Sequence, residues 1–184
     1  MAAATGGLAL TSLGQALAQE ANHKVFLPMS MKQAYLNGSI NTLSSRVVHV
    51  HDANASSWTG SPKNYWNYVN QGAVDSMVDQ GMMLLTGTTS MADAWSAVLP
   101  NYQAGQTVAV KVSFGNTSTC TENSGEIDGV VEPVNAVIRG LKAIGVAEAD
   151  IWIYETIRAL PNRFVNGCDY SNVTFFDNGS CGHN

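Results

Sequence analysis

Charge is scarce in this sequence, and positive charge most of all. Charged residues make up 12% of its 184 positions, and nine Lys and Arg against fourteen Asp and Glu give a formal net charge of -5. Proteins that bind nucleic acid or an anionic membrane surface rely on clustered Lys and Arg to attract phosphate groups. The basic residues of this chain are scattered, so we expect neither partner.

Cysteine is scarce as well. Cys120, Cys168 and Cys181 form no C-x-x-C pair and no C-x2-C-x2-C run of the kind that holds an iron–sulfur cluster in ferredoxins. One disulfide is plausible in an exported chain. The pair Cys168–Cys181 would join a helix end to a nearby loop, and Cys120 would then be free or would pair with a cysteine beyond Asn184.

The beginning of the chain lacks charge altogether. No Asp, Glu, Lys or Arg occurs in residues 1–18, which end in the small-x-small pattern Ala16-Leu17-Ala18. The run is too short for a membrane-spanning helix of about 20 residues. We predict that it is the remnant of a secretory signal peptide. The alternative is an Ala-rich helix that packs on the domain.

The positive start of such a signal is missing, because no Lys or Arg precedes Lys24. A weakly hydrophobic run diluted by Gly, Ser and Thr resembles the twin-arginine signals that carry folded proteins across a membrane. The two arginines would then lie upstream of Met1. We therefore expect a periplasmic or extracellular protein without a stable membrane span.

After the signal, residues 19–45 are predicted to be a linker and residues 46–184 an α/β domain. Short β-branched runs predict strands over Arg46–Ala53, Thr107–Phe114, Asp150–Glu155 and Asn172–Gly179. Apolar residues three and four apart, with capping residues and stops, predict helices over Val69–Leu85, Ser90–Leu99, Pro133–Ile144 and Pro161–Gly167.

This alternation predicts a mainly parallel sheet with helices on both faces, a Rossmann-like three-layer α/β fold. The strands are apolar on both faces, as a doubly covered sheet requires. The final residues trail off after a strand without a closing helix, so the sheet is expected to be incomplete at the C-terminus.

The stretch Val47–Asn178 resembles the family of domains of unknown function numbered 362. The resemblance rests on "VAVKVSF", "EIDGVVEPVNAVIRGLKAIGV", "DIWIYETIRALPNRF" and "YSNVTFFDN", with "VVHVHDANASSW" upstream. The family has no settled activity. Some of its members carry ferredoxin-like iron–sulfur segments, and many are exported by the twin-arginine route. The resemblance implies that Lys111, on the Lys-bearing strand of the family, contacts a ligand.

Open α/β sheets bind ligands at the carboxyl ends of their strands. On the first predicted strand, His49 and His51 alternate to the same side and Asp52 follows. Two imidazoles and a carboxylate could bind zinc or a similar ion. Alternatively these residues only end a strand, and Asp52 starts the turn.

Two further strand ends carry candidate ligand-binding residues. Lys111, Ser113 and Asn116 follow the second strand, where a lysine could contact a carboxylate or phosphate or reach solvent. Glu155 ends the third strand and could act as a general base or metal ligand. Arg158 could clamp an anionic group, or the two could form a surface pair of little energetic value.

Arg163 and a group of aromatic residues indicate no particular chemistry. Arg163 is predicted to be an exposed helix residue. Aromatic residues gather in one loop-to-helix segment, where they could stack on a sugar or ring or pack over a sheet edge: Trp58, Tyr65, Trp66 and Tyr68.

Three functions stay open at this point. The first is an exported binding or redox-accessory domain that holds a metal ion, an anionic cofactor or an iron–sulfur group, with a small molecule or ion and a redox protein as partners. The second is a periplasmic hydrolase or transferase with Glu155 or His51 as general base. The third is a structural or partner-binding domain without catalysis. The first two require that His51, Lys111 and Glu155 converge on one cleft.

Overall fold

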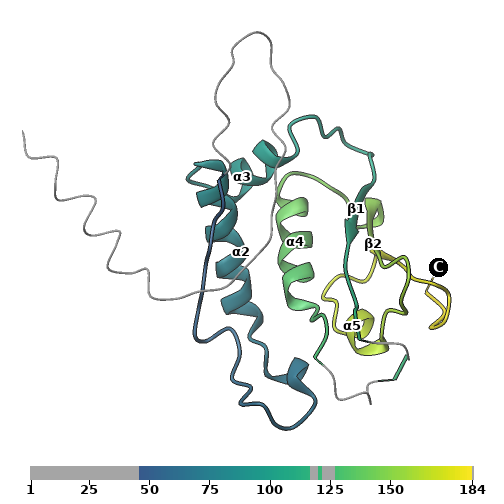
Figure 1. Cartoon of the computed structure of the whole chain (residues 1–184). Coiled ribbons are helices and arrows are strands. Elements are labelled where there is room, and N and C mark those ends of the chain that lie inside the picture. The colour runs from purple at the N-terminus through teal and green to yellow at the C-terminus, as the bar shows by residue number, and fades with distance from the viewer. Residues whose placement is uncertain (1–45, 117–119, 122–126, 184) are drawn as a thin grey trace, which may run out of the picture.

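The structure, a computed structural model, describes residues 46–116, 120–121 and 127–183 (Figure 1). The predicted signal remnant 1–18 and linker 19–45 lie outside these residues. Helices and strands follow in the order η1 (Tyr65–Tyr68), α2 (Gln71–Thr86), α3 (Met91–Val98), β1 (Val108–Lys111), α4 (Glu132–Ala143), η2 (Glu148–Asp150), β2 (Ile151–Tyr154), α5 (Asn162–Asn166) and β3 (Thr174–Phe176).

Side-chain and glycine caps mark the ends of helices α2 and α3, close to the ends that the sequence predicts. The Asn70 side chain accepts a hydrogen bond from the backbone N–H of Ala73 at the start of α2. Gly87 ends this helix with a φ of 74°, a left-handed conformation that favours glycine. At the start of α3, the Ser90 side chain accepts from the Asp93 N–H and donates to the Asp93 carboxylate. The predictions of these helices are confirmed.

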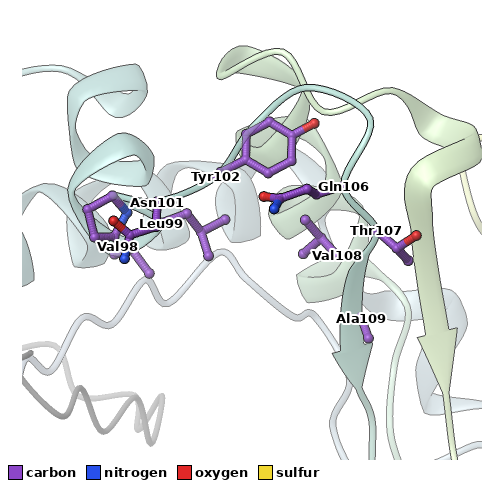
Figure 2. Close-up of a pocket in the computed structure, with 9 residues that line it drawn as sticks. Val98, Leu99, Asn101, Tyr102, Gln106, Thr107, Val108 and Ala109 are labelled. Atoms are coloured by element: carbon purple, nitrogen blue, oxygen red, sulfur yellow. The ribbon is translucent and has the colours of Figure 1, made fainter.

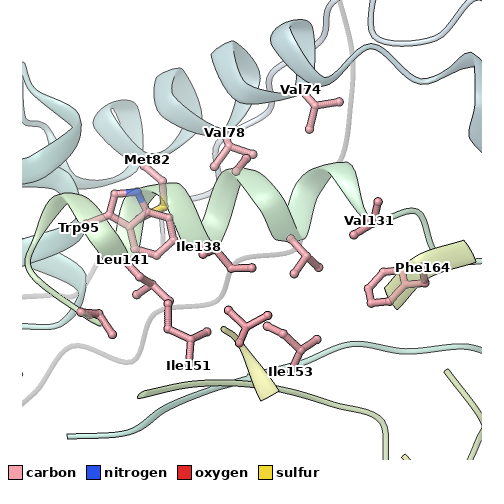
Figure 3. Close-up of a cluster of buried hydrophobic side chains, with 14 of the residues drawn as sticks. Val74, Val78, Met82, Trp95, Val131, Ile138, Leu141, Ile151, Ile153 and Phe164 are labelled. Atoms are coloured by element: carbon pink, nitrogen blue, oxygen red, sulfur yellow. The ribbon is translucent and has the colours of Figure 1, made fainter. Parts of the chain in front are cut away.

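The three strands form a parallel sheet in the order β1-β2-β3. Ile151 and Ile153 of β2 are fully buried on one face of the sheet. Helix α4 lies on this face and contributes Ile138 and Leu141 to the same apolar core (Figure 3). The prediction of an α/β fold with a parallel sheet is therefore confirmed.

Helices α2 and α3 form a second layer, which packs mainly on α4 (Figures 1 and 3). Trp95 of α3 lies close against Gly140 of α4. A Cβ atom on Gly140 would lie 1.9 Å from Trp95 Nε1, so a glycine is required for the two helices to pack at this distance. The layers of the described residues are thus sheet, α4, and then α2 with α3.

The helices of the described residues cover only one face of the sheet, whereas the sequence predicts helices on both. Helix α5 packs on the same face as α4, because the rings of Phe164 and Phe175 meet there. The opposite face is more exposed, and Trp152 on it is 42% exposed. Its side chains are those of Ala109, Lys111, Trp152, Tyr154, Thr174 and Phe176. The three-layer arrangement is not confirmed.

The direction of the chain explains the single covered face. Both crossovers step the same way across the sheet, from β1 to β2 and from β2 to β3. Right-handed crossovers that step the same way place their helices on the same face. A helix on the other face would need a crossover that steps in the opposite direction, and the described strands include none.

The predicted strand Arg46–Ala53 is wrong. This segment lies outside the sheet and runs along the flank of α2 (Figure 1). The Arg46 guanidinium donates to the Leu84 carbonyl oxygen at 3.2 Å, near the end of the helix. Further along, Val50 Cγ2 is close enough to Gly81 that a Cβ atom there would lie 3.5 Å away.

The exposure of this segment shows why the strand prediction failed. Val47 is 79% exposed although it belongs to the β-branched run. The pattern of apolar residues gave the extended conformation, but a pattern does not specify which surface an extended segment contacts. Within the described residues, Arg46 and Val50 of this segment contact helix α2.

Candidate functional site at the carboxyl edge of the sheet

Two of the three residues predicted to converge do lie together. Lys111 ends β1 and Glu155 follows the last residue of β2, which is the neighbouring strand. The Lys111 ammonium is 3.9 Å from Glu155 Oε2. The lysine side chain is 50% exposed and the glutamate side chain only 4%. A surface cation is thus placed over a buried carboxylate.

Glu155 accepts backbone hydrogen bonds from the loops after both strands. Its Oε2 accepts from the N–H of Phe114, which follows β1, and its Oε1 accepts from the N–H of Ile157, which follows β2, each at 3.0 Å. The backbone of Arg158 adds a further favourable contact. Burial alone would raise the pKa of Glu155. These N–H groups and the Lys111 ammonium outweigh burial and hold the pKa below its ordinary value.

This environment makes Glu155 a poor general base. A general base works best when its pKa lies near the operating pH and when its lone pairs can reach a substrate proton. The Glu155 carboxylate has a lowered pKa, is almost fully buried and has both oxygens in hydrogen bonds to the backbone. Its contacts suit a residue that positions two loops and the Lys111 side chain.

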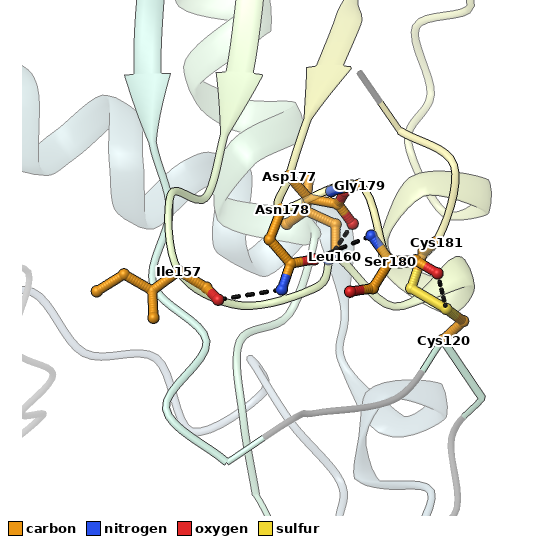
Figure 4. Close-up of a disulfide and its surroundings, with 8 residues drawn as sticks. All are labelled: Cys120, Ile157, Leu160, Asp177, Asn178, Gly179, Ser180 and Cys181. Atoms are coloured by element: carbon orange, nitrogen blue, oxygen red, sulfur yellow. Dashed lines mark hydrogen bonds between the residues drawn. A yellow bond between two sulfur atoms is a disulfide. The ribbon is translucent and has the colours of Figure 1, made fainter.

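Two other carboxylates fix the loops at this edge in the same way. Asp128 accepts from the backbone N–H groups of Gly115 and Asn116, at 3.1 and 3.0 Å. Asp177, just after β3, accepts from the N–H of Leu160 at 2.9 Å (Figure 4). Neither acid is among the site residues predicted from the sequence. Asp177 could have been found as the acid that ends the last strand, whereas Asp128 lies in a loop without periodicity.

A disulfide joins two of these loops. Cys120, from the loop after β1, is bonded to Cys181, from the loop after β3, with 5.3 Å between their Cα atoms (Figure 4). The predicted pair Cys168–Cys181 is therefore wrong. Cys168 is a half-buried free thiol at the end of α5, and burial raises its pKa. The pairing follows from the folded positions of the loops and not from sequence distance.

The remaining predicted ligand-binding residues occupy different positions at the edge. Ser113 is exposed two residues after Lys111. Asn116 is engaged in the loop itself, because its side-chain amide donates to the Ile127 carbonyl oxygen at 2.8 Å. Arg158 is exposed in the loop after β2. The described ion pairs place Lys111, and not Arg158, beside Glu155.

The predicted metal ligands do not join this edge. His49, His51 and Asp52 belong to the segment beside α2, which α4 separates from the sheet (Figure 1). The Asp52 carboxylate accepts from the N–H of Asn54 at 2.8 Å, which makes it the first residue of a turn. Over the described ranges, no three His, Cys, Asp or Glu residues are grouped so that they could hold a metal ion. The metal prediction has no structural support.

Arg163 is not the exposed helix residue that the sequence predicts. Its guanidinium is half-buried and donates to the Gly129 carbonyl oxygen at 2.8 Å and to the Tyr65 hydroxyl at 3.0 Å. It also lies over the ring of Trp66, 4.6 Å from the centroid. The Tyr65 hydroxyl in turn donates to the Asp128 carbonyl oxygen. Tyr65 and Arg163 therefore hold the loop at Asp128 and Gly129 by hydrogen bonds.

Comparison with known proteins gave no match to a family model, to a curated protein or to a solved structure. The resemblance to the family numbered 362 therefore remains an expectation based on the quoted motifs. None of the helices within the described residues has the length and apolar character needed to cross a membrane.

The role of Glu155 predicts a pH-dependent loss of stability in the Glu155→Gln variant. A hydrogen bond to a charged group contributes about 1.5–3 kcal/mol. The Gln side chain keeps one acceptor oxygen and loses one of the two backbone hydrogen bonds, so we expect the variant to lose about 2–3 kcal/mol of unfolding free energy at pH 7. The folded-state pKa is below the ordinary value of 4.5. The stabilisation is therefore complete above that value and disappears as the pH falls through the folded-state pKa.

Urea denaturation of both proteins across this pH range measures the difference. The matched control is Asp150→Asn, because the described residues offer the Asp150 side chain no hydrogen bond or ion pair. We expect its stability to differ little from that of the parent protein at every pH. A Glu155→Gln deficit that stays constant into the acid range would contradict the ionised, backbone-bound carboxylate.

The disulfide predicts a specific peptide map. After alkylation of free thiols under non-reducing conditions, Cys168 should carry the label, and the Cys120 and Cys181 peptides should be linked. Cys168→Ser leaves that link intact, whereas Cys120→Ser removes it and costs about 4 kcal/mol for a loop of this length. A linked Cys168–Cys181 peptide would overturn the assignment.

Proposed function

We propose that this chain is an exported α/β domain that binds a small anionic molecule at the carboxyl edge of its sheet, with Lys111 as the principal cation. The observation that carries the proposal is the pairing of Lys111 with Glu155 at the ends of adjacent strands. This is the edge at which open parallel sheets bind ligands. A half-exposed ammonium here keeps donors for a ligand while its position is held by the buried carboxylate.

Two neighbouring side chains offer further hydrogen-bond donors to an anion. Ser113 follows Lys111 by two residues and is exposed, so its hydroxyl is available to an oxyanion. Arg158 is exposed in the loop whose backbone Glu155 holds. A lysine, a hydroxyl and a guanidinium are the donors that proteins use for phosphates and carboxylates. The loops that carry them are pinned by Glu155, Asp128 and Asp177, which limits the entropy lost on binding.

The contacts favour binding over catalysis. Glu155, the predicted general base, is already bonded to the backbone. His51, the other candidate, belongs to the segment whose residues Arg46 and Val50 contact α2. An iron–sulfur cluster needs several cysteine thiolates, and two of the three cysteines of this chain are bonded to each other. The proposal therefore names an anionic ligand and gives Glu155 a positioning role.

Export is supported by the disulfide together with the sequence of residues 1–18. Disulfides persist in oxidising compartments such as the bacterial periplasm and are rare in the cytosol. An uncharged, Ala-rich run with a small-x-small end precedes the domain. Both features agree with the exported members of the family that the chain resembles.

Isothermal titration of the full chain with inorganic phosphate and with citrate tests the proposal. We expect saturable binding, and a loss of about 10-fold or more in affinity for Lys111→Met, because a charge-assisted hydrogen bond contributes about 1.5–3 kcal/mol. Lys111→Arg keeps the charge and should bind more tightly than Lys111→Met.

The matched control is Lys63→Met, which removes an exposed lysine from the loop before η1. It removes one positive charge, as Lys111→Met does, and should bind both anions like the parent protein. If neither anion gives saturable heat, or if the two methionine variants lose affinity equally, the proposed site is wrong.

A further inference from the structure

We propose that two copies of this chain associate by antiparallel pairing of their β1 strands, which would form one continuous six-stranded sheet across a twofold axis. The inference goes beyond the proposed anion site, because it uses the backbone edge of β1 and the surface beside its first residues.

Among the described residues, the backbone of β1 is hydrogen-bonded on one side only. The N–H of Val112 donates to the Tyr154 carbonyl oxygen, so the backbone groups of residues 108, 110 and 112 point toward β2. In a strand, alternate residues point their N–H and C=O groups to opposite sides. Those of Ala109 and Lys111 therefore point outward, and β1 is an edge strand of the described sheet.

This edge lacks the usual protection against strand pairing. Natural edge strands carry charges, prolines or bulges that prevent association. From Val98 to Val110 the chain has no charged residue, and its one proline, Pro100, lies well before β1. The first charge is Lys111, whose ammonium lies beside Glu155 and donates to the Val112 carbonyl oxygen. The lysine side chain therefore does not cover the outward backbone edge of β1.

A groove of about 750 Å³ lies beside the edge, between the end of α3 and the first residues of β1 (Figure 2). Its lining is mostly apolar and includes Val98, Leu99, Tyr102 and Val108. The lining residues are all uncharged. A strand docked on β1 would therefore extend along a surface that accepts neutral side chains.

The absence of charge along this edge, in a chain of net charge -5, favours a second copy as the occupant. Each copy has a formal net charge of -5, so association is favoured only where acidic side chains are kept apart. The stretch Val98–Val110 is neutral, and each Lys111 has its own Glu155 beside it, so the paired edges bring no unmatched charges together. The second copy presents the same β-branched, singly paired strand, as a twofold interface requires.

The outward groups also fix the register. Pairing Ala109 of one copy with Lys111 of the other places the two Val110 residues opposite each other at the twofold axis. The N–H and C=O groups of both outward residues are then hydrogen-bonded in each copy. The two open sheet faces become one surface, which carries Trp152 of both copies.

Sedimentation velocity of the oxidised full chain over a hundredfold concentration range tests the inference. We expect a reversible dimer. Ala109→Pro removes an outward N–H without loss of a hydrogen bond to β2, and it should weaken the dimer by about 10-fold or more. Far-UV circular dichroism reports whether the variant is folded.

Ala104→Pro is the matched control. Gln106 N–H donates to the Gln103 carbonyl oxygen, and Gly105 has a φ of 86°, so Ala104 occupies the turn position that accepts proline. This variant should dimerise like the parent protein. The proposal is overturned if the parent protein is a monomer at every concentration, or if the folded Ala109→Pro variant dimerises equally well.

Amide hydrogen exchange gives a second readout that needs no variant. Exchange at Ala109 and Lys111 should slow as concentration rises, while exchange in the loop at Gly105 should not change. A dimer that leaves both amides unaffected would use a different surface, such as the open sheet face, and would also overturn the proposal.

Discussion

The structure at the carboxyl edge of the sheet depends on the contacts of one buried group, the carboxylate of Glu155. It joins the backbone after β1 to the backbone after β2 and lies beside the Lys111 ammonium. Removing water from a carboxylate is unfavourable unless other groups stabilise its charge. Here two loops supply N–H groups to it, so the loops and the charged group stabilise each other. The position of Lys111, and hence the proposed anion site, follows from this arrangement.

The direction of the crossovers determines the other main feature of the molecule. Because both crossovers step in the same direction across the sheet, α4 and α5 lie on the same face. The described part of the sheet therefore has an open face and an open edge at β1. The helices α2 and α3 bury their apolar sides on α4. The anion site and the proposed pairing edge therefore occur on the same strand, but one uses the side chain of Lys111 and the other its backbone.

The features that depend on local sequence pattern could be predicted. The capped helices and the adjacency of Lys111 and Glu155 follow from spacing, and from the rule that parallel strands end at one edge. The segment Arg46–Ala53 has the pattern of a strand, but its contact with α2 depends on the whole fold. Three cysteines allow three pairings. The observed disulfide and the contacts of Asp128 arise between loops that sequence does not place together.

The central claim is that Glu155 is ionised and held by backbone N–H groups in the folded protein. Carbon-13 NMR titration of the Glu155 side-chain carboxyl measures this most directly. The account predicts a pKa below the ordinary value of 4.5, because burial, which raises the pKa, is outweighed by the N–H groups of Ile157 and Phe114 and by the Lys111 ammonium. A pKa at or above 4.5 would contradict it.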